Sequence, residues 1–188
     1  MSSQQAVAAV VVLAAGQGTR MRSATPKVLH ELGGRSMLGH VLAAAEPLGA
    51  RTTLVVVGSG REVVEDHLAA VAPAARAVLQ AEQLGSGHAA RVALDAVPDL
   101  EGPVLVVNGD APLLRTTTLA ALVEGHAAAG SVFTVLTAVV DDPTGLGRIV
   151  RDAGGAPARR PPKTKFCSAS CRPKRRTRTM KRRASAPP

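Results

Sequence analysis

The sequence is poor in aromatic residues, with no Trp, no Tyr and two Phe among its 188 residues. Aliphatic side chains must therefore build the core, and the aromatic platforms used to stack single-stranded nucleic acid are missing. Cysteine occurs only at Cys167 and Cys171, so residues 1–155 cannot hold a disulfide framework, which suits a reducing compartment. These two cysteines lack a second pair or a nearby His, which argues against a zinc site.

Acidic residues are absent from residues 156–188, which hold 12 of the 23 Lys and Arg. The first 155 residues carry 11 basic and 14 acidic groups, a net charge of −3, although the whole chain has +9. This balance excludes a basic nucleic-acid-binding fold for residues 1–155. Lysine is also scarce there, because Lys27 is the only one.

No Lys or Arg precedes Arg20, although residues 6–15 form an apolar run. A signal peptide needs a positively charged segment before its apolar one, and a membrane span needs about 20 apolar residues. We therefore expect the run to be a buried strand in a soluble, cytoplasmic protein without a membrane segment.

Apolar runs alternate with helical patterns up to residue 140. Strands are predicted at residues 7–13, 52–57, 77–79, 104–107 and 131–140. Helices are predicted from Ser36 to Pro47, over 62–71, after Gly87 to about Val97, and over 117–128. This alternation predicts an α/β fold with a mostly parallel, Rossmann-like sheet and helices on both faces. Ligands should then bind at the carboxyl ends of the strands, near residues 16–27, 80–86 and 108–110.

The composition changes sharply at Ala156, and residues 156–188 are predicted to be disordered because they cannot bury enough apolar area. Two interpretations stay open for this tail: a basic interaction arm, or an out-of-frame product of a frameshift. The abrupt stop of the pattern at Gly154-Gly155 favours the second. The predicted domains are one α/β domain over residues 1–155 and a basic tail over residues 156–188.

The first predicted strand leads into a glycine loop, Gly16-Gln17-Gly18-Thr19-Arg20-Met21. Two glycines let backbone N–H groups approach an anion closely. Met21 stands where a dinucleotide-binding loop needs a third Gly, and the Gly-Lys-Ser/Thr of a P-loop is absent. Arg20 and Lys27 together suit a triphosphate. The alternative is a plain turn with solvated cations, against which the uniqueness of Lys27 argues.

The loop and the following Pro26-Lys27 resemble the sugar-phosphate nucleotidyltransferase family. Three more stretches, at residues 80–89, 109–113 and 142–149, are similar to the bacterial bifunctional enzymes that join an N-acetylglucosamine-1-phosphate uridylyltransferase to a glucosamine-1-phosphate acetyltransferase. The resemblance implies transfer of UMP from UTP to N-acetylglucosamine 1-phosphate. The products are UDP-N-acetylglucosamine, a cell-wall precursor, and pyrophosphate.

The resemblance also implies roles for individual residues. Arg20 and Lys27 are the catalytic residues, acting on the phosphates, and Asp110 is the ligand of the cofactor Mg²⁺. Gly147 lies against the sugar. The residues that bind UTP are Leu13, Ala14, Ala15, Gly16, Gly18, Thr19, Lys27, Gln80, Gly85, Ser86, Asn108 and Gly109. Position 108 is often Tyr in the family. His30 and His88 lie inside family motifs and are expected to support loops, whereas His67 is expected to pack in the core.

The resemblance ends near residue 155, before the family's remaining sugar and magnesium ligands and its hexapeptide repeats. The implied expectation is an aggregation-prone fragment with weak UTP binding, little or no turnover, no acetyltransferase activity and no homotrimer. Two alternatives stay open. One is another nucleotidyltransferase of the molybdopterin or cytidylyl type, against which residues 80–89 and 142–149 argue. The other is an inactive fragment whose basic tail binds nucleic acid.

Overall fold

The computed structural model describes residues 7–16, 21, 23, 25–58, 60–142, 144–147 and 149–151, and the backbone of residues 178–180. The chain divides into two compact units, residues 1–123 and 124–188, which are described separately below. The domain boundary expected at residue 155 stays a prediction.

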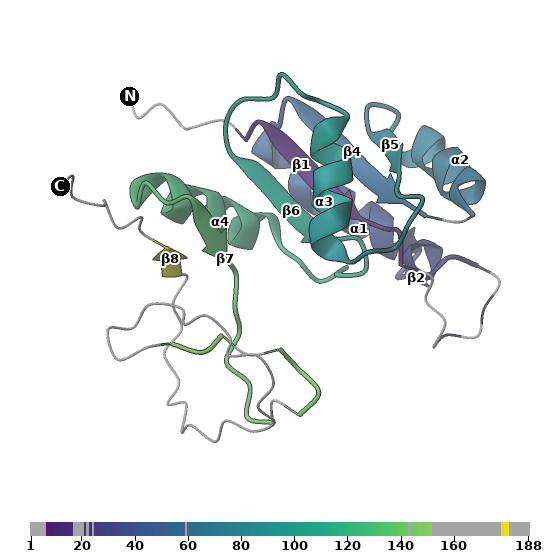
Figure 1. Cartoon of the computed structure of the whole chain (residues 1–188). Helices are drawn as coiled ribbons and strands as arrows, with labels where there is room; N and C mark the ends of the chain where they lie inside the picture. Colours follow the sequence, from purple (N-terminus) through teal and green to yellow (C-terminus); the bar gives the residue numbers. More distant parts are fainter. Residues whose placement is uncertain are drawn as a thin grey trace. The chain divides into compact units, whose positions relative to one another are not determined.

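A four-stranded parallel sheet forms the centre of the first unit, with the strand order β5-β4-β1-β6 (Figure 1). Its strands are β1 (Ala9–Leu13), β4 (Thr52–Val57), β5 (Arg76–Leu79) and β6 (Val104–Asn108). β1 pairs with β4 on one side and with β6 on the other. Valine and leucine fill β1 and β4 almost without interruption, as strands buried on both faces require. The predicted strand 52–57 is confirmed residue for residue.

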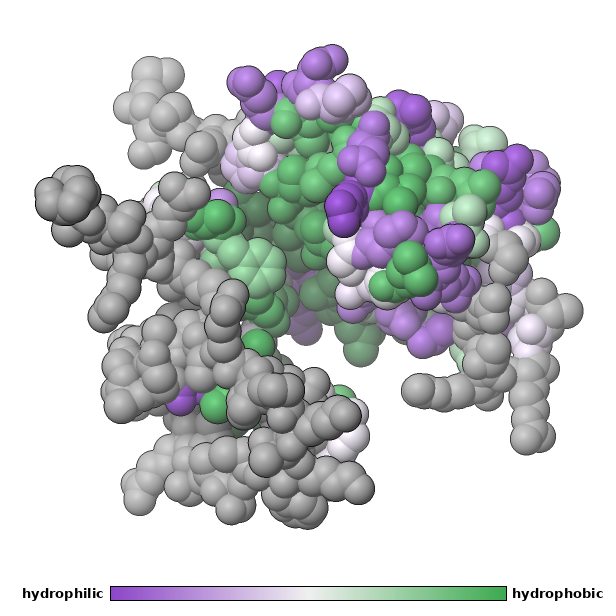
Figure 2. Space-filling model, in the orientation of Figure 1, coloured by the Kyte–Doolittle hydropathy of each residue, from purple (hydrophilic) through white to green (hydrophobic). Residues whose placement is uncertain are grey.

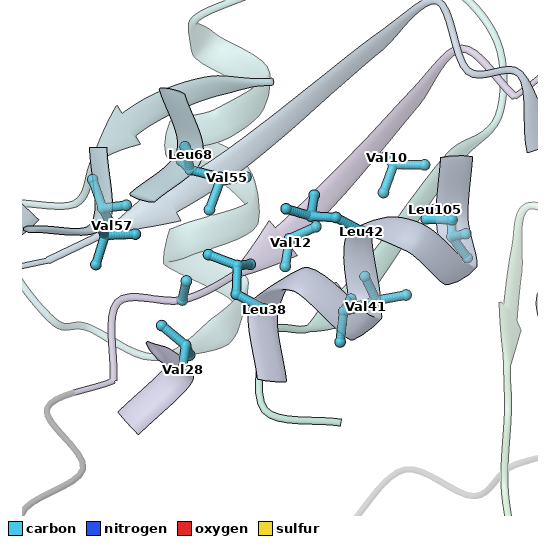
Figure 3. Packing of buried hydrophobic residues seen from close by; sticks show 14 of the residues in the cluster. Val10, Val12, Val28, Leu38, Val41, Leu42, Val55, Val57, Leu68 and Leu105 are labelled. Atoms are coloured by element: carbon cyan, nitrogen blue, oxygen red, sulfur yellow. The ribbon is translucent and has the colours of Figure 1, made fainter. Parts of the chain in front are cut away.

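Helices cover both faces of this sheet. Helices α1 (Met37–Ala45) and α2 (Arg61–Val71) pack with one set of sheet residues, and α3 (Ser86–Asp95) packs with the other set. On the α1 face, Leu38, Val41 and Leu42 pack toward the strands (Figure 3). On the α3 face, Ala89 and Ala93 are buried against β1 and β4. The expected α/β fold with helices on both faces is confirmed.

Local sequence explains where α1 begins and ends. The Ser36 hydroxyl accepts a hydrogen bond from the Gly39 N–H at 2.9 Å, which satisfies one of the free amides of the first turn. The same hydroxyl shares a 2.7 Å hydrogen bond with Nε2 of His67 on α2, so this histidine joins two helices. At the other end, a 3-10 turn, η3 (Glu46–Leu48), is closed by Gly49 at φ +63°.

A short hairpin precedes α1. Its strands β2 (Glu31–Leu32) and β3 (Arg35–Ser36) are joined by Gly33 and Gly34, with φ of +61° and +79°. Positive φ at both turn residues is typical of a two-residue hairpin and favours glycine there. Before the hairpin, the 3-10 turn η2 (Lys27–Leu29) is anchored by the buried Val28. This anchor fixes the backbone that carries Lys27.

β6 is an edge strand, because among the described residues it pairs with β1 alone. Leu105 and Val107 are buried, whereas Val106 is 44% exposed. Apolar surface gathers on the side of the first unit that carries β6 and α3 (Figure 2).

The second unit contains the end of α4 (Thr116–Ala128) and a two-stranded antiparallel sheet of β7 (Phe133–Val135) and β8 (Arg178–Met180). The prediction of one long strand over residues 131–140 was wrong, since only residues 133–135 are in a strand. Phe133 and Val140 are 57% and 45% exposed, so the segment lacks the buried surface that would extend it. Apart from 178–180, the tail that was expected to be disordered lies outside the described residues.

Candidate functional site

The strand order brings three sequence-distant loops to one edge of the sheet. From β1 the chain continues to β4 and β5, then returns past β1 to β6, so the order reverses between β1 and β6. In open parallel sheets, ligands bind outside the carboxyl ends of the strands beside such a reversal. Residues 14–16, 80–86 and 109–110 follow these strand ends. The sequence predicted ligand-binding segments at 16–27, 80–86 and 108–110, and of these, residues 17–20, 22 and 24 lie outside the described part of the chain.

A hollow of about 300 Å³ lies at this edge, within the first unit. Its size is at the lower end of the range for small-molecule sites. Nine residues predicted to bind substrate or metal line it: Leu13, Ala15, Gly16, Lys27, Gln80, Gly85, Ser86, Asn108 and Asp110. The sequence shows the order of the three motifs along the chain, and the structure shows that their residues line one hollow.

The other predicted site residues either do not line this hollow or lie outside the described part of the chain. Ala14 lines a neighbouring hollow of about 220 Å³ on the other side of the β1 loop. Gly109 is buried beneath the site, and its N–H donates to the Leu13 carbonyl at 2.9 Å, which ties the end of β6 to β1. Gly147 belongs to the second unit. Gly18, Thr19 and Arg20 lie outside the described residues.

Lys27 and Asp110 form an ion pair in the hollow, although 83 residues separate them. Lys27 Nζ lies 2.6 Å from Asp110 Oδ2, and each side chain is 38% exposed. A pair this open to water contributes about 0–1 kcal/mol to stability, so folding alone does not explain it. An ammonium group can bind phosphate, and a carboxylate is a hard oxygen ligand for a divalent cation. A group that can bind phosphate and a group that can hold a divalent cation therefore lie side by side in the hollow.

The Gln80 side chain is the buried polar group of the site, at 4% exposure. Its Nε2 lies 3.3 Å from the Gly85 carbonyl and 3.0 Å from Nδ1 of His88. Gly85 has φ of +96° and directly precedes α3, so the loop and the first turn of the helix hold this amide together. The prediction that His88 supports a loop agrees with this contact.

Three lining residues were not among the predicted site residues: Val28, Gln83 and Ala89. Gln83 is the most informative, because its Nε2 donates to the Ala15 carbonyl at 2.7 Å and so connects the β1 loop to the segment after β5. The signal was present in the sequence, since Gln83 lies inside the motif at residues 80–89. Only the folded chain shows that it contacts residues 68 positions earlier.

Gly58, at the end of β4, packs directly against this connection. A Cβ at this position would lie 2.8 Å from the Ala15 carbonyl oxygen and 3.2 Å from Gln83 Nε2. Gly58→Ala should therefore force the β1 loop to move and lower the free energy of unfolding by about 1–3 kcal/mol. Thermal melting of the full chain measures the effect.

Gly87→Ala is the matched control for Gly58→Ala, because a Cβ on Gly87 meets nothing within 4 Å and the residue lies in α3. It should stabilise the chain slightly, by up to about 1 kcal/mol, since alanine favours helix. Equal melting temperatures for the two variants would contradict the close packing of Gly58.

The donor set fits a metal site that is shared with a substrate. Among the described residues, no three His, Cys, Asp or Glu side chains come together. Mg²⁺ is commonly held by one or two carboxylates together with substrate phosphates and water. The half-exposed carboxylate of Asp110 suits such a site, and an all-protein cage is not found in the part of the chain that is described. In the same part, no helix is both long and apolar enough to span a membrane.

Comparison with known families identifies the family of this chain. The family described as "MobA-like NTP transferase domain" matches residues 10–178. The chain belongs to this family. The sequence-based assignment to the nucleotidyltransferases is therefore confirmed, and the hollow lies where an NTP transferase of this fold class is expected to bind nucleotide.

Relatives of this NTP transferase include two curated proteins named "Bifunctional protein GlmU". The one from Thermobifida fusca is 57% identical over 153 residues, which is 79% of this chain and 32% of the relative. The one from Streptomyces coelicolor is 60% identical over 151 residues, or 79% of this chain and 31% of the relative. The chain thus spans about a third of the length of these relatives. Its predicted similarity to the bifunctional enzymes is confirmed.

A solved structure of Rv0371c from Mycobacterium tuberculosis, in complex with manganese, is also similar to this NTP transferase. It has a TM-score of 0.52 and 26% sequence identity, and the match covers 64% of this chain and 60% of that one.

Proposed function

We propose that the hollow at the end of β1 binds UTP. We propose further that the chain acts in the Mg²⁺-dependent transfer of UMP from UTP to N-acetylglucosamine 1-phosphate, which supplies UDP-N-acetylglucosamine for cell-wall precursors. One observation carries the proposal: the 2.6 Å pair of Lys27 and Asp110 lines the same hollow as the buried amide of Gln80. Groups suited to phosphate, metal and base thus share one cavity. The proposed location is the cytoplasm, where UTP is made.

Base recognition is assigned to Gln80, Gly85 and Ser86. Gln80 is almost completely buried, so its amide is held in one place and loses little freedom when a ligand binds. Leu13 and Ala15 offer backbone groups at the end of β1, and the small side chain of Ala15 leaves room for the flat base or the ribose to lie against the chain.

Phosphate binding is assigned to Lys27, with Arg20 of the preceding loop as a second cation. Lys27 is fixed at the start of η2, which Val28 anchors in the core. Its ammonium group contacts the Asp110 carboxylate in this structure. We propose that, when a nucleotide binds, the ammonium group donates hydrogen bonds to its phosphates as well as to Asp110.

The transfer needs charge neutralisation and alignment more than covalent catalysis. A phosphate oxygen of the sugar phosphate forms a bond to the α-phosphorus of UTP, the bond between that phosphorus and its bridging oxygen breaks, and the electron pair leaves with pyrophosphate. Lys27 holds the phosphates in position and balances their negative charge. Asp110 would hold Mg²⁺, which supplies further positive charge to the phosphates. The manganese in the structure of Rv0371c supports a divalent metal in this fold.

A second candidate is transfer from another nucleotide, of the molybdopterin or cytidylyl type, because the family description names MobA-like domains in general. The two GlmU relatives at 57% and 60% identity favour UTP. For the sugar phosphate, we propose that Gly147 contacts the sugar of N-acetylglucosamine 1-phosphate. The chain spans about a third of these relatives, so nucleotide binding is the part of the proposal that the described hollow supports directly.

The test is a thermal melt of the full chain followed by circular dichroism, with UTP, CTP or GTP and with or without Mg²⁺. A ligand that binds only the folded state stabilises it by about 2.7 kcal/mol at 100 times its Kd. UTP with Mg²⁺ should raise the melting midpoint, and CTP and GTP should raise it less. A larger shift with CTP or GTP would establish the second candidate, and no shift with any nucleotide would overturn the proposal.

A further inference from the structure

The amide of Gln80 makes two hydrogen bonds through the same atom, and these fix which way round it lies. Its Nε2 contacts the Gly85 carbonyl at 3.3 Å and His88 Nδ1 at 3.0 Å. A carbonyl oxygen can only accept a hydrogen bond, so the amide nitrogen, and not its oxygen, must face Gly85. An NH₂ group can only donate, so Nδ1 of His88 must accept.

This pairing determines the state of the histidine. Nδ1 can accept only when it carries no proton, so this contact requires the His88 tautomer with its proton on Nε2. If the Gln80 amide rotated by half a turn, Oε1 would face the oxygen of Gly85 and the two acceptors would repel each other. The two partners together therefore select a single orientation.

We infer that His88 is a positioning residue that sets the base preference of the site by holding the Gln80 amide with its oxygen toward the ligand. The amide's hydrogen bonds to Gly85 and His88 are both made through Nε2, and Gln80 lines the hollow, so the oxygen is the end of the amide that we expect a ligand to meet. The inference rests on the proposed function and adds to it the origin of the preference for one pyrimidine.

An acceptor at this position discriminates between uracil and cytosine. Uracil carries a hydrogen on ring nitrogen N3 and can donate it to Oε1. The N3 of cytosine carries a lone pair instead, so it would face the lone pairs of Oε1. A fixed amide therefore favours uracil, whereas an amide free to rotate could present its NH₂ group to cytosine and accept both bases.

The position of His88 is set by the helix that carries it. α3 begins at Ser86, and the Gly85 carbonyl also accepts from the Ala89 N–H at 3.1 Å, so both partners of Gln80 belong to the first turn. Ala89 and Ala93 are 3% and 0% exposed and anchor this helix on the sheet. The helix thus holds the imidazole in place, and His88 is not among the residues that line the hollow.

The first experiment compares UTP and CTP affinities of the full chain and three variants. His88→Leu removes the acceptor, and His88→Asn offers an amide oxygen close to the former Nδ1. His126→Leu is the control, because this part-buried histidine bonds Thr134 at 2.9 Å and belongs to the second unit. In His88→Leu, the preference for UTP over CTP should fall about three- to tenfold, the effect of one neutral hydrogen bond. It should recover in His88→Asn and stay unchanged in His126→Leu.

The second experiment examines the free protein by nuclear magnetic resonance, without nucleotide. His88 should show its proton on Nε2 at neutral pH, and the Gln80 side-chain NH₂ protons should exchange slowly in the wild type and in His88→Asn but rapidly in His88→Leu. A proton on Nδ1, or equal losses of UTP and CTP affinity in His88→Leu, would overturn the inference. A wild-type chain that binds neither nucleotide would overturn the proposed function, and the NMR result would then decide the orientation of Gln80 alone.

Discussion

Replacing Lys27 with methionine should weaken the binding of UTP by about 10- to 100-fold, the range expected for the loss of one charged hydrogen bond. Methionine keeps much of the length of the lysine side chain but cannot donate to phosphate. The change also leaves Asp110 without its 2.6 Å partner, so a negative charge would face the nucleotide. Titration of the full chain with UTP in the presence of Mg²⁺ measures this loss.

The stability of the Lys27→Met variant separates binding from folding. Both side chains of the pair are 38% exposed, so the melting midpoint without nucleotide should change little. Arg91→Met, an exposed cation on α3 that does not line the hollow, is the matched control and should keep the wild-type affinity. An unchanged affinity for UTP in Lys27→Met, or an equal loss of affinity in Arg91→Met, would contradict the proposal that Lys27 binds the phosphates.

Leu38→Ala should cause the largest loss of stability, about 2–5 kcal/mol of the free energy of unfolding. Leu38 is 0% exposed and lies on α1 against the sheet, with Val12 and Leu42 nearby in the same cluster (Figure 3). Alanine has a high helix propensity, so the loss of stability would come from the cavity left in the core and not from a weaker helix. For a chain of this size the melting midpoint should fall by roughly 4–20 °C.

Leu113→Ala provides the control for this cavity, because Leu113 is 81% exposed. It should change the free energy of unfolding by no more than about 0.5 kcal/mol. Similar midpoints for the two leucine variants would mean that Leu38 does not pack in a folded core.

The sequence was most informative where burial is local and continuous. The predicted strand 52–57 became β4 without a shift, because residues 54–57 are apolar and fully buried, as a strand covered on both faces requires. Ser36 and Gly49 marked the cap and the stop of α1 and its following turn, since both act on neighbouring backbone groups.

Prediction from sequence failed where the deciding partner was distant. Residues 131–140 have strand-like composition, but composition does not show whether a neighbouring strand is available along the whole segment, and only 133–135 found one. The motifs predicted one site for Lys27 and Asp110, and the structure brings the two side chains together, yet their direct ion pair depends on loops 83 residues apart. The orientation of Gln80 likewise required the position of His88 in the folded helix.

The central position of β1 also determines the order in which the sheet can be completed. Ala9 pairs with Thr52, 43 residues later, and with Val104, 95 residues later. Ribosomes add about 5–20 residues per second, so β1 exists for roughly 5–20 s before its second partner has been made. Parallel pairs must close such long loops before they gain contact energy, which slows folding. Of the four strands of this sheet, β1 is therefore made before the others but gains its second neighbour last, when residues 104–108 arrive.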